Sequence, residues 1–283
     1  ACLPGHFKAM NGSSSCVACA VGSYLNVSAG TACVGCPAGN RSTSLRGSAE
    51  EIDCICVAGY TGRDGGQCVA CGLGTYKALN GSSSCVRCRA GTYLNVSAGT
   101  VCVGCPAGNY SSSPMASVDV EACVCKAGYT GPDGGQCAAC LPGHFKAMNG
   151  SSSCVACAVG SYLNVSAGTA CVGCPAGNRS TSLRGSAEEI DCICVAGYTG
   201  RDGGQCVACG LGTYKALNGS SSCVRCRAGT YLNVSAGTVC VGCPAGNYSS
   251  SPMASVDVEA CVCKAGYTGP DGGQCAACLP GHF

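Results

Sequence analysis

The chain has 283 residues, of which 33 are cysteine and 45 are glycine, while tryptophan is absent and phenylalanine occurs three times. This composition excludes an ordinary hydrophobic core and is typical of a scaffold held together by disulfides. The net charge of +2 and the 11% of charged residues offer no basic stripe to a nucleic acid, and no apolar run approaches the ~18 residues that span a bilayer.

A pattern of eight cysteines organises the whole sequence. They are Cys2, Cys16, Cys19, Cys33, Cys36, Cys54, Cys56 and Cys68. The pattern restarts at Cys71, and the offset from Cys2 to Cys71 is the single period of the chain. Residues 139–276 repeat residues 1–138 letter for letter, so the offset from Ala1 to Ala139 is a double period, twice as long.

The expected domains follow from these two periods. They are repeat A at 1–69, repeat B at 70–138, repeat A again at 139–207, repeat B again at 208–276, and the start of a further repeat A at 277–283.

The sequence begins and ends within this pattern, and no cysteine follows Cys278 to complete its segment. We interpret the chain as a window on a longer array. Each repeat is near the size at which cross-links usually have to supplement burial.

Four short segments follow one another within a repeat, and each opens with C-x-x-G. In repeat A these openings place Gly5, Gly22, Gly39 and Gly59 in one register, which favours a turn with positive φ or a close approach of two chain segments. A second turn signal, such as Asn11-Gly12, divides most segments into two short stretches. We therefore predict small irregular hairpins.

Helix is not expected, because no segment keeps apolar residues at helical spacing for more than a turn. The one exception is residues 48–52, where the sequence allows a single helical turn. The predicted fold class is small disulfide-rich tandem repeats, an elongated array of short irregular β-hairpin modules with almost no helix.

Repeats A and B differ most between their fifth and sixth cysteines. Residues 41–53 of repeat A and residues 110–122 of repeat B have little in common. These alternating loops are the candidate contact surfaces of the array, and they make the double period the expected structural repeat.

Every asparagine lies in an N-x-S/T sequon, which predicts N-linked glycans. The acceptors are Asn11, Asn26, Asn40, Asn80, Asn95, Asn109, Asn149, Asn164, Asn178, Asn218, Asn233 and Asn247. Disulfides at this density persist in an oxidising setting. Both signals predict an extracellular protein, secreted or on a cell-surface appendage.

Two local motifs resemble known extracellular families. Residues 54–60 with Cys68 have the form C-x-C-x-x-G-Y-x7-C and resemble the closing half of an EGF-like domain. The C-x-x-G-x-Y openings and C-x-x-C junctions, as at residues 88–93 and 102–110, resemble ephrin-receptor-like cysteine-rich repeats, which are similar in appearance to tumour-necrosis-factor-receptor modules. Arrays that mix the two look like extracellular proteins of protists and algae, including mastigoneme (flagellar hair) proteins.

The resemblance implies disulfides between successive cysteines. It pairs Cys2 with Cys16, Cys19 with Cys33, Cys36 with Cys54, and Cys56 with Cys68. Spacing alone leaves other pairings open.

Two sets of residues could be proposed as metal ligands, and each has a simpler structural explanation. Cys16, Cys19, Cys33 and Cys36 approach the spacing of a four-cysteine zinc site, but one-disulfide loops that meet at C-x-x-C joints give the same spacing. For calcium, the candidate ligands are Glu50, Glu51, Asp53 and Asp64. The chain lacks the acidic cluster that precedes the first cysteine of calcium-binding EGF modules, and Asp64 fits a turn.

Catalysis has no supporting residues in the sequence. His6, His144 and His282 occupy one register, have no carboxylate at short spacing, and are interpreted as exposed loop residues. We therefore predict no enzyme activity, no catalytic or metal site and no cofactor.

The predicted function is an extracellular structural glycoprotein that self-associates into a filament, rod or surface hair. The alternative is the stalk or ligand-binding ectodomain of an adhesion receptor. Repeated identical loops count against that alternative, because a specific partner needs a distinct surface.

Overall fold

The computed structural model describes residues 1–282. Within this range the chain forms 16 two-stranded antiparallel sheets joined by turns and short 3-10 helices, and no α-helix occurs. The expected fold class of small disulfide-rich repeats built from short hairpins is confirmed.

All strands are two residues long, and they pair two by two in chain order, β1 with β2, β3 with β4 and so on. Residues 1–70 contain β1 (His6–Phe7), β2 (Val17–Ala18), β3 (Ser23–Tyr24), β4 (Val34–Gly35), β5 (Ser42–Thr43), β6 (Ile55–Cys56), β7 (Tyr60–Thr61) and β8 (Val69–Ala70). Residues 71–139 contain β9 (Thr75–Tyr76), β10 (Val86–Arg87), β11 (Thr92–Tyr93), β12 (Val103–Gly104), β13 (Ser111–Ser112), β14 (Val124–Cys125), β15 (Tyr129–Thr130) and β16 (Ala138–Ala139).

The second copy has the same elements. Residues 140–208 contain β17 (His144–Phe145), β18 (Val155–Ala156), β19 (Ser161–Tyr162), β20 (Val172–Gly173), β21 (Ser180–Thr181), β22 (Ile193–Cys194), β23 (Tyr198–Thr199) and β24 (Val207–Ala208). Residues 209–277 contain β25 (Thr213–Tyr214), β26 (Val224–Arg225), β27 (Thr230–Tyr231), β28 (Val241–Gly242), β29 (Ser249–Ser250), β30 (Val262–Cys263), β31 (Tyr267–Thr268) and β32 (Ala276–Ala277).

Eight 3-10 helices of three residues complete the structure described for residues 1–282. They are η1 (Gly39–Arg41), η2 (Glu51–Asp53), η3 (Gly108–Tyr110), η4 (Val120–Ala122), η5 (Gly177–Arg179), η6 (Glu189–Asp191), η7 (Gly246–Tyr248) and η8 (Val258–Ala260). The helical turn expected at residues 48–52 is therefore found slightly later, at η2. The shift follows from Asp53, whose carboxylate Oδ2 accepts hydrogen bonds from the backbone N–H groups of Ala49 (3.0 Å) and Glu50 (2.9 Å).

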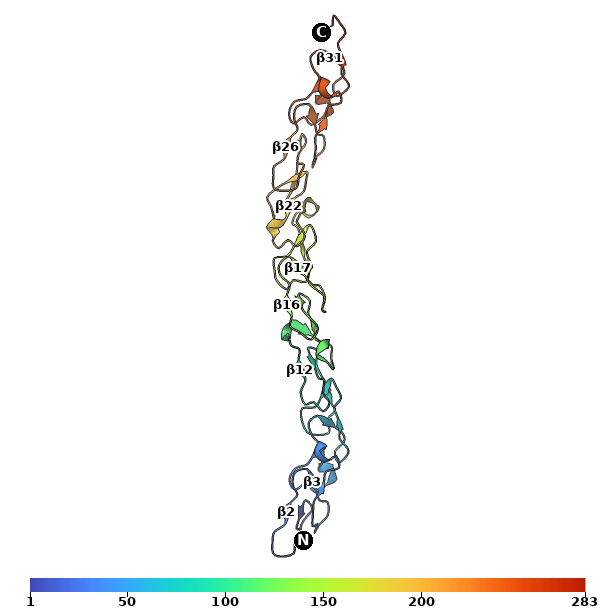
Figure 1. Cartoon of the computed structure of the whole chain (residues 1–283), viewed down its shortest axis with the longest axis vertical. Coiled ribbons are helices and arrows are strands. Elements are labelled where there is room, and N and C mark those ends of the chain that lie inside the picture. The colour runs from blue at the N-terminus through green and yellow to red at the C-terminus, as the bar shows by residue number, and fades with distance from the viewer. Residues whose placement is uncertain (283) are drawn as a thin grey trace. The chain divides into compact units, whose positions relative to one another are not determined.

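The chain divides into two compact units. One comprises Ala1–Ala138 with Asn149–Ser153, and the other comprises Ala139–Met148 with Cys154–Phe283. Within each unit the hairpins follow one another in chain order (Figure 1).

From Cys2 to Cys275 disulfides join successive cysteines in pairs, which is the pairing implied by the family resemblance, and Cys278 is free. In repeat A they close a first loop (Cys2–Cys16), a second loop (Cys19–Cys33), a third loop (Cys36–Cys54) and a fourth loop (Cys56–Cys68). The two cysteines of each bond are separated by 12 to 18 residues, so each cross-link is local. Closing a loop of about 15 residues stabilises a fold by roughly 3 kcal/mol in the chain-entropy account.

The C-x-x-G glycines have the predicted positive φ. The angle is +81° at Gly5, +81° at Gly22, +57° at Gly39 and +85° at Gly59. Gly5 also makes a close approach, because a Cβ there would collide with the carbonyl oxygen of Gly47, two loops further along the chain. At Gly22 a Cβ would meet nothing within 4 Å. All four glycines therefore have the expected positive φ, and Gly5 also makes the expected close approach, whereas Gly22 does not.

Backbone hydrogen bonds join each loop to the next one. The carbonyl oxygen of Cys2 accepts from the N–H of Ala29 (2.8 Å), that of Cys19 from Gly47 (2.9 Å), that of Cys54 from Gly65 (2.7 Å) and that of Cys56 from Gly81 (2.8 Å). The same four bonds recur in repeat A of the second copy, at Ala167, Gly185, Gly203 and Gly219. Because the contacts connect near neighbours in the chain, each compact unit has the organisation of a repeat protein.

Half-cystines supply most of the buried core. Cys19 and Cys56 have no exposed surface, and Leu25 is the buried aliphatic side chain of the second loop, with 4% of its surface exposed. Leu25 contacts Gly30 so closely that a Cβ at Gly30 would overlap its side chain. One leucine and several disulfides therefore replace the core that the composition excludes.

Candidate functional site

The third loop of repeat A carries a shallow apolar groove. Val21, Leu45 and Ile52 line it, and they expose 66%, 82% and 61% of their surface. Thr43, Ile55 and Asn80 also line it, Asn80 from the loop that follows the fourth disulfide. Exposed aliphatic side chains gathered in one groove make it a candidate binding surface.

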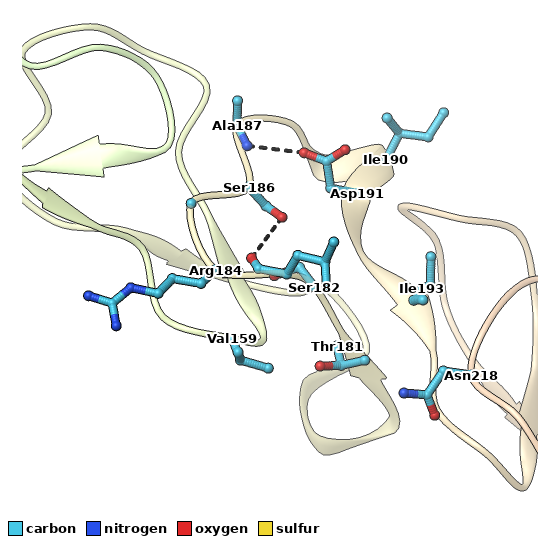
Figure 2. Close-up of a pocket in the computed structure, with 12 residues that line it drawn as sticks. Val159, Thr181, Ser182, Arg184, Ser186, Ala187, Ile190, Asp191, Ile193 and Asn218 are labelled. Atoms are coloured by element: carbon cyan, nitrogen blue, oxygen red, sulfur yellow. Dashed lines mark hydrogen bonds between the residues drawn. The ribbon is translucent and has the colours of Figure 1, made fainter.

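The second copy has the same groove, drawn in Figure 2. Val159, Ile190 and Ile193 lie around it, and Thr181 and Asn218 lie at one side. Leu183, the counterpart of Leu45, exposes 82% of its surface. The groove therefore recurs with the double period of the sequence.

Local side-chain hydrogen bonds hold the loop that forms this groove. The Asp191 carboxylate accepts from the N–H of Ala187 at 3.0 Å, and the Ser186 hydroxyl donates to the carbonyl oxygen of Leu183 at 2.9 Å (Figure 2). These bonds fix the two successive turns of the segment that runs from Leu183 to Asp191 and carries Ile190. The apolar side chains thus stand on a preformed backbone.

Repeat B has a different surface at the same register. Pro114 and Glu121 replace Leu45 and Ile52, so the groove loses its two large aliphatic side chains. Tyr110, Met115 and Val118 are exposed instead, at 51%, 65% and 47%. As expected, the third loops of repeats A and B present different surfaces.

A ring contact supports the third loop in both repeats, but with different partners. In repeat B the rings of Tyr110 and Tyr129 have centroids 4.8 Å apart at an angle of 31°. In repeat A the guanidinium of Arg41 lies 5.9 Å from the ring centroid of Tyr60. The first is an aromatic pair and the second a cation–π contact, and each joins the third loop to the fourth.

All twelve sequon asparagines are exposed. Three of them, Asn80, Asn149 and Asn218, have their carboxamide Oδ1 held by the N–H groups of Ala58, Ala127 and Ala196, each at 2.9 Å. In an N-linked glycan the sugar is attached to the other atom, Nδ2. The hydrogen bond therefore fixes the carboxamide without blocking the attachment atom.

A buried lysine crosses from the first loop of repeat B back to the fourth loop of repeat A. Lys77 exposes 2% of its surface, and its Nζ donates to the carbonyl oxygens of Tyr60 (2.8 Å), Cys56 (3.4 Å) and Gly81. Burial lowers the pKa of Lys77, and the nearby carboxylate of Asp64 opposes that shift. Asp64 Oδ1 is itself buried without a hydrogen-bond partner.

Sequence reasoning missed both the groove and this lysine. A signal for the lysine was present, because Lys8, Lys77, Lys146 and Lys215 recur at the single period, each directly after an aromatic residue. The groove had no comparable signal, since its residues come from separate loops.

The cysteines of the candidate zinc site are paired in disulfides. Cys19 and Cys33 are bonded to each other, and Cys16 and Cys36 are bonded to Cys2 and Cys54, so these cysteines have no thiolate for zinc. Within residues 1–282 no group of three or more His, Cys, Asp or Glu side chains is arranged to hold a metal ion.

The interpretation of the histidines as exposed loop residues is wrong for two of them. His6 and His144 lie half-buried in β1 and β17, because each is the first residue of a paired strand.

A helix long and apolar enough to cross a membrane is not found in the part of the chain that the structure describes.

Comparison with protein families gives a match that agrees with the repeated disulfide loops. A family model described as tyrosine-protein kinase ephrin type A/B receptor-like matches residues 2–54, 59–98, 147–192 and 197–236, more than half of the chain. The chain belongs to this family. These ephrin-receptor-like repeats are ectodomain modules, and with the disulfide density they indicate an extracellular or secreted array. No curated protein matches the chain.

The matched ranges omit one surface in both copies. Residues 99–146 and 237–283 fall outside them, and these contain the third loop of repeat B, closed by Cys105–Cys123 and Cys243–Cys261. The third loop of repeat B, with Tyr110, therefore lies outside the matched ranges in both copies.

Proposed function

We propose that this chain is part of an extracellular structural glycoprotein whose ephrin-receptor-like repeats build a filament, rod or surface hair by self-association. The repeats as residues 1–69, 70–138, 139–207 and 208–276, with a further start at 277–283, are the proposed domains. The function is mechanical: covalent loops resist unfolding, and repeated identical surfaces allow copies to bind one another in a regular register.

The hydrogen bonds between successive loops are the observation that carries this proposal. Each compact unit has one such bond at every step from loop to loop of repeat A. A chain that is cross-linked within every loop and bonded between neighbouring loops has few places where it can extend under load. This organisation suits a load-bearing array.

The proposed glycans fit the same role. All twelve acceptors are exposed, and in three of them Oδ1 is fixed while Nδ2 is left for attachment. Sugars at a regular spacing would keep the surface hydrated and protected from proteases.

The stalk or ligand-binding ectodomain of an adhesion receptor is the second candidate. The family match favours it, because the matched repeats are named for receptors. In that case the third loop of repeat B, with Tyr110, Met115 and Val118, is the surface that would meet the ligand.

Electron microscopy of the secreted, non-reduced protein separates the two candidates. Self-association predicts regular filaments that survive dilution and whose axial repeat corresponds to the single or the double period of the sequence. A population of single, dispersed molecules at every concentration would reject the filament and favour the receptor stalk.

A further inference from the structure

The apolar groove of repeat A has a glycan-acceptor asparagine at its edge in both copies. Asn80 lines the groove of the first copy, and Asn218 lines that of the second. Both are acceptors in N-x-S sequons. The first sugar of a glycan attached to either asparagine would therefore lie next to the groove.

The carboxamide is held in an orientation that directs the sugar. Oδ1 of Asn218 accepts from the N–H of Ala196 at 2.9 Å, and within residues 1–282 its Nδ2 has no hydrogen-bond partner. Figure 2 shows Asn218 beside Ile193 and Thr181, with its carboxamide nitrogen toward Thr181 in this view. The linkage atom therefore faces the groove.

The chemistry of the groove matches a sugar ring. One face of N-acetylglucosamine carries only C–H groups and can lie on Val21, Leu45 and Ile52, while its hydroxyl and acetamide groups can reach the Thr43 hydroxyl and water. A binding site of this kind is mostly apolar with a few polar groups at its edge. We propose that the first N-acetylglucosamine of the glycans on Asn80 and Asn218 packs into the groove of the preceding repeat A and covers it.

Repeat B provides an internal control. Oδ1 of Asn149 makes the same hydrogen bond, to the N–H of Ala127 at 2.9 Å. The residues at the groove positions before it are Ala90, Pro114 and Glu121, which offer no comparable apolar floor. A glycan on Asn149 should therefore extend into solvent.

The inference rests on the proposed glycosylation and refines the proposed contacts between copies. If sugars cover the groove of repeat A, the exposed loop of repeat B, with Tyr110 and Met115, is left as the surface for self-association.

The test compares sugar removal at these sites in the folded, non-reduced protein secreted by a eukaryotic cell. Peptide N-glycosidase hydrolyses the amide bond between Cγ and Nδ2. The sugar leaves as a glycosylamine and aspartate remains, so peptide mass spectrometry reports the rate at each site. Because the two copies have identical sequences, Asn80 and Asn218 are read together, and Asn11→Gln gives Asn149 a peptide of its own. We expect hydrolysis at Asn80 and Asn218 to be several-fold slower than at Asn149, with equal rates after reduction and denaturation.

Polar variants of the groove complete the test. Leu45→Ser and Ile52→Ser, with the same changes at Leu183 and Ile190, alter exposed side chains and should raise the rate at Asn80 and Asn218 to that at Asn149. Equal rates in the original protein, a slow rate that survives these substitutions, unoccupied Asn80 and Asn218, or a second copy cross-linked at Leu45 would each overturn the inference.

Filament formation is scored separately by microscopy of the same samples. Filaments should persist in the groove variants, and their loss in those variants alone would also overturn the inference. Absence of filaments in the original protein would reject the proposed function and leave the comparison of hydrolysis rates intact.

Discussion

Gly5 and Gly22 have the same φ of +81° and the same place in their loops, yet they have different surroundings. A Cβ at Gly5 would collide with the Gly47 carbonyl, whereas a Cβ at Gly22 would enter open space. The two positions therefore separate the cost of a left-handed backbone from the cost of a close approach between loops.

We predict that Gly22→Ala, made with Gly160→Ala, destabilises the local fold by about 1–2 kcal/mol, the cost of a left-handed alanine. Gly5→Ala with Gly143→Ala should cost about 1–3 kcal/mol more, because the added methyl group forces the first and third loops apart. Amide hydrogen exchange at β1 and β5 measures both effects. Equal costs for the two pairs would show that the close approach relaxes without penalty.

Lys77 and Lys215 predict a pH dependence of stability. Burial lowers the pKa of each below the ordinary value of 10.5. Between the lowered pKa and pH 10.5 the unfolded chain binds more protons than the folded chain. The free energy of unfolding therefore rises with pH in this range and stops rising above pH 10.5. Thermal unfolding midpoints of the non-reduced protein across this window measure the effect, with Cys278→Ser present to prevent thiol exchange.

Removing these ammonium groups should have two consequences. Lys77→Met with Lys215→Met flattens the pH dependence, and at neutral pH it destabilises each site by about 1–3 kcal/mol because carbonyl oxygens of Tyr60 and Gly81 lose a charged donor. Lys126→Met with Lys264→Met is the control, since both lysines are exposed. An unchanged slope in the first variant would assign the pH dependence to other groups.

At the scale of the element, the second loop depends on one aliphatic side chain. We predict that Leu25→Ala with Leu163→Ala costs about 2–5 kcal/mol, because a buried leucine side chain is lost and a cavity is left. Val27→Ala with Val165→Ala changes side chains that are 52% exposed and should cost less than about 0.5 kcal/mol. Exchange protection of β3 and β4 reports the difference, and similar losses in the two variants would contradict it.

Local features of these elements could be predicted from the sequence, because one short segment contains all the residues that determine them. The positive φ at Gly39 and the bend at Asn11-Gly12 are of this kind. The approach of Gly5 to Gly47 is not, because it joins residues from two loops. The groove could not be predicted for the same reason, since Val21, Leu45 and Asn80 meet only after three loops have folded.

The burial of Lys77 is another feature that could not be predicted from the sequence. A lysine is almost never fully buried unless it has partners. Its partners here are backbone carbonyl groups of Cys56, Tyr60 and Gly81, which have no signature in the sequence. Periodicity marked the position, but the burial itself depends on how the fourth loop meets the next repeat.

At the scale of the whole molecule, the disulfides are local and the contacts join near neighbours in the chain. We therefore predict that the loss of one disulfide destabilises only the adjacent loops. We expect Cys36→Ser with Cys54→Ser, made in the first copy only, to open the third loop and to loosen the second and fourth loops, whose hydrogen bonds depend on it. Distant loops should keep their protection, because no bond of the third loop reaches them.

Because the two copies have identical sequences, one hydrogen-exchange experiment tests this prediction. Peptides from the second and fourth loops have the same mass in residues 1–138 and 139–276, so both copies contribute to one isotope envelope in hydrogen exchange. Local loosening predicts two separate populations in that envelope, one exchanged and one protected. Cooperative unfolding of the whole chain predicts a single exchanged population, and that result would reject the independence of the repeats on which a load-bearing array depends.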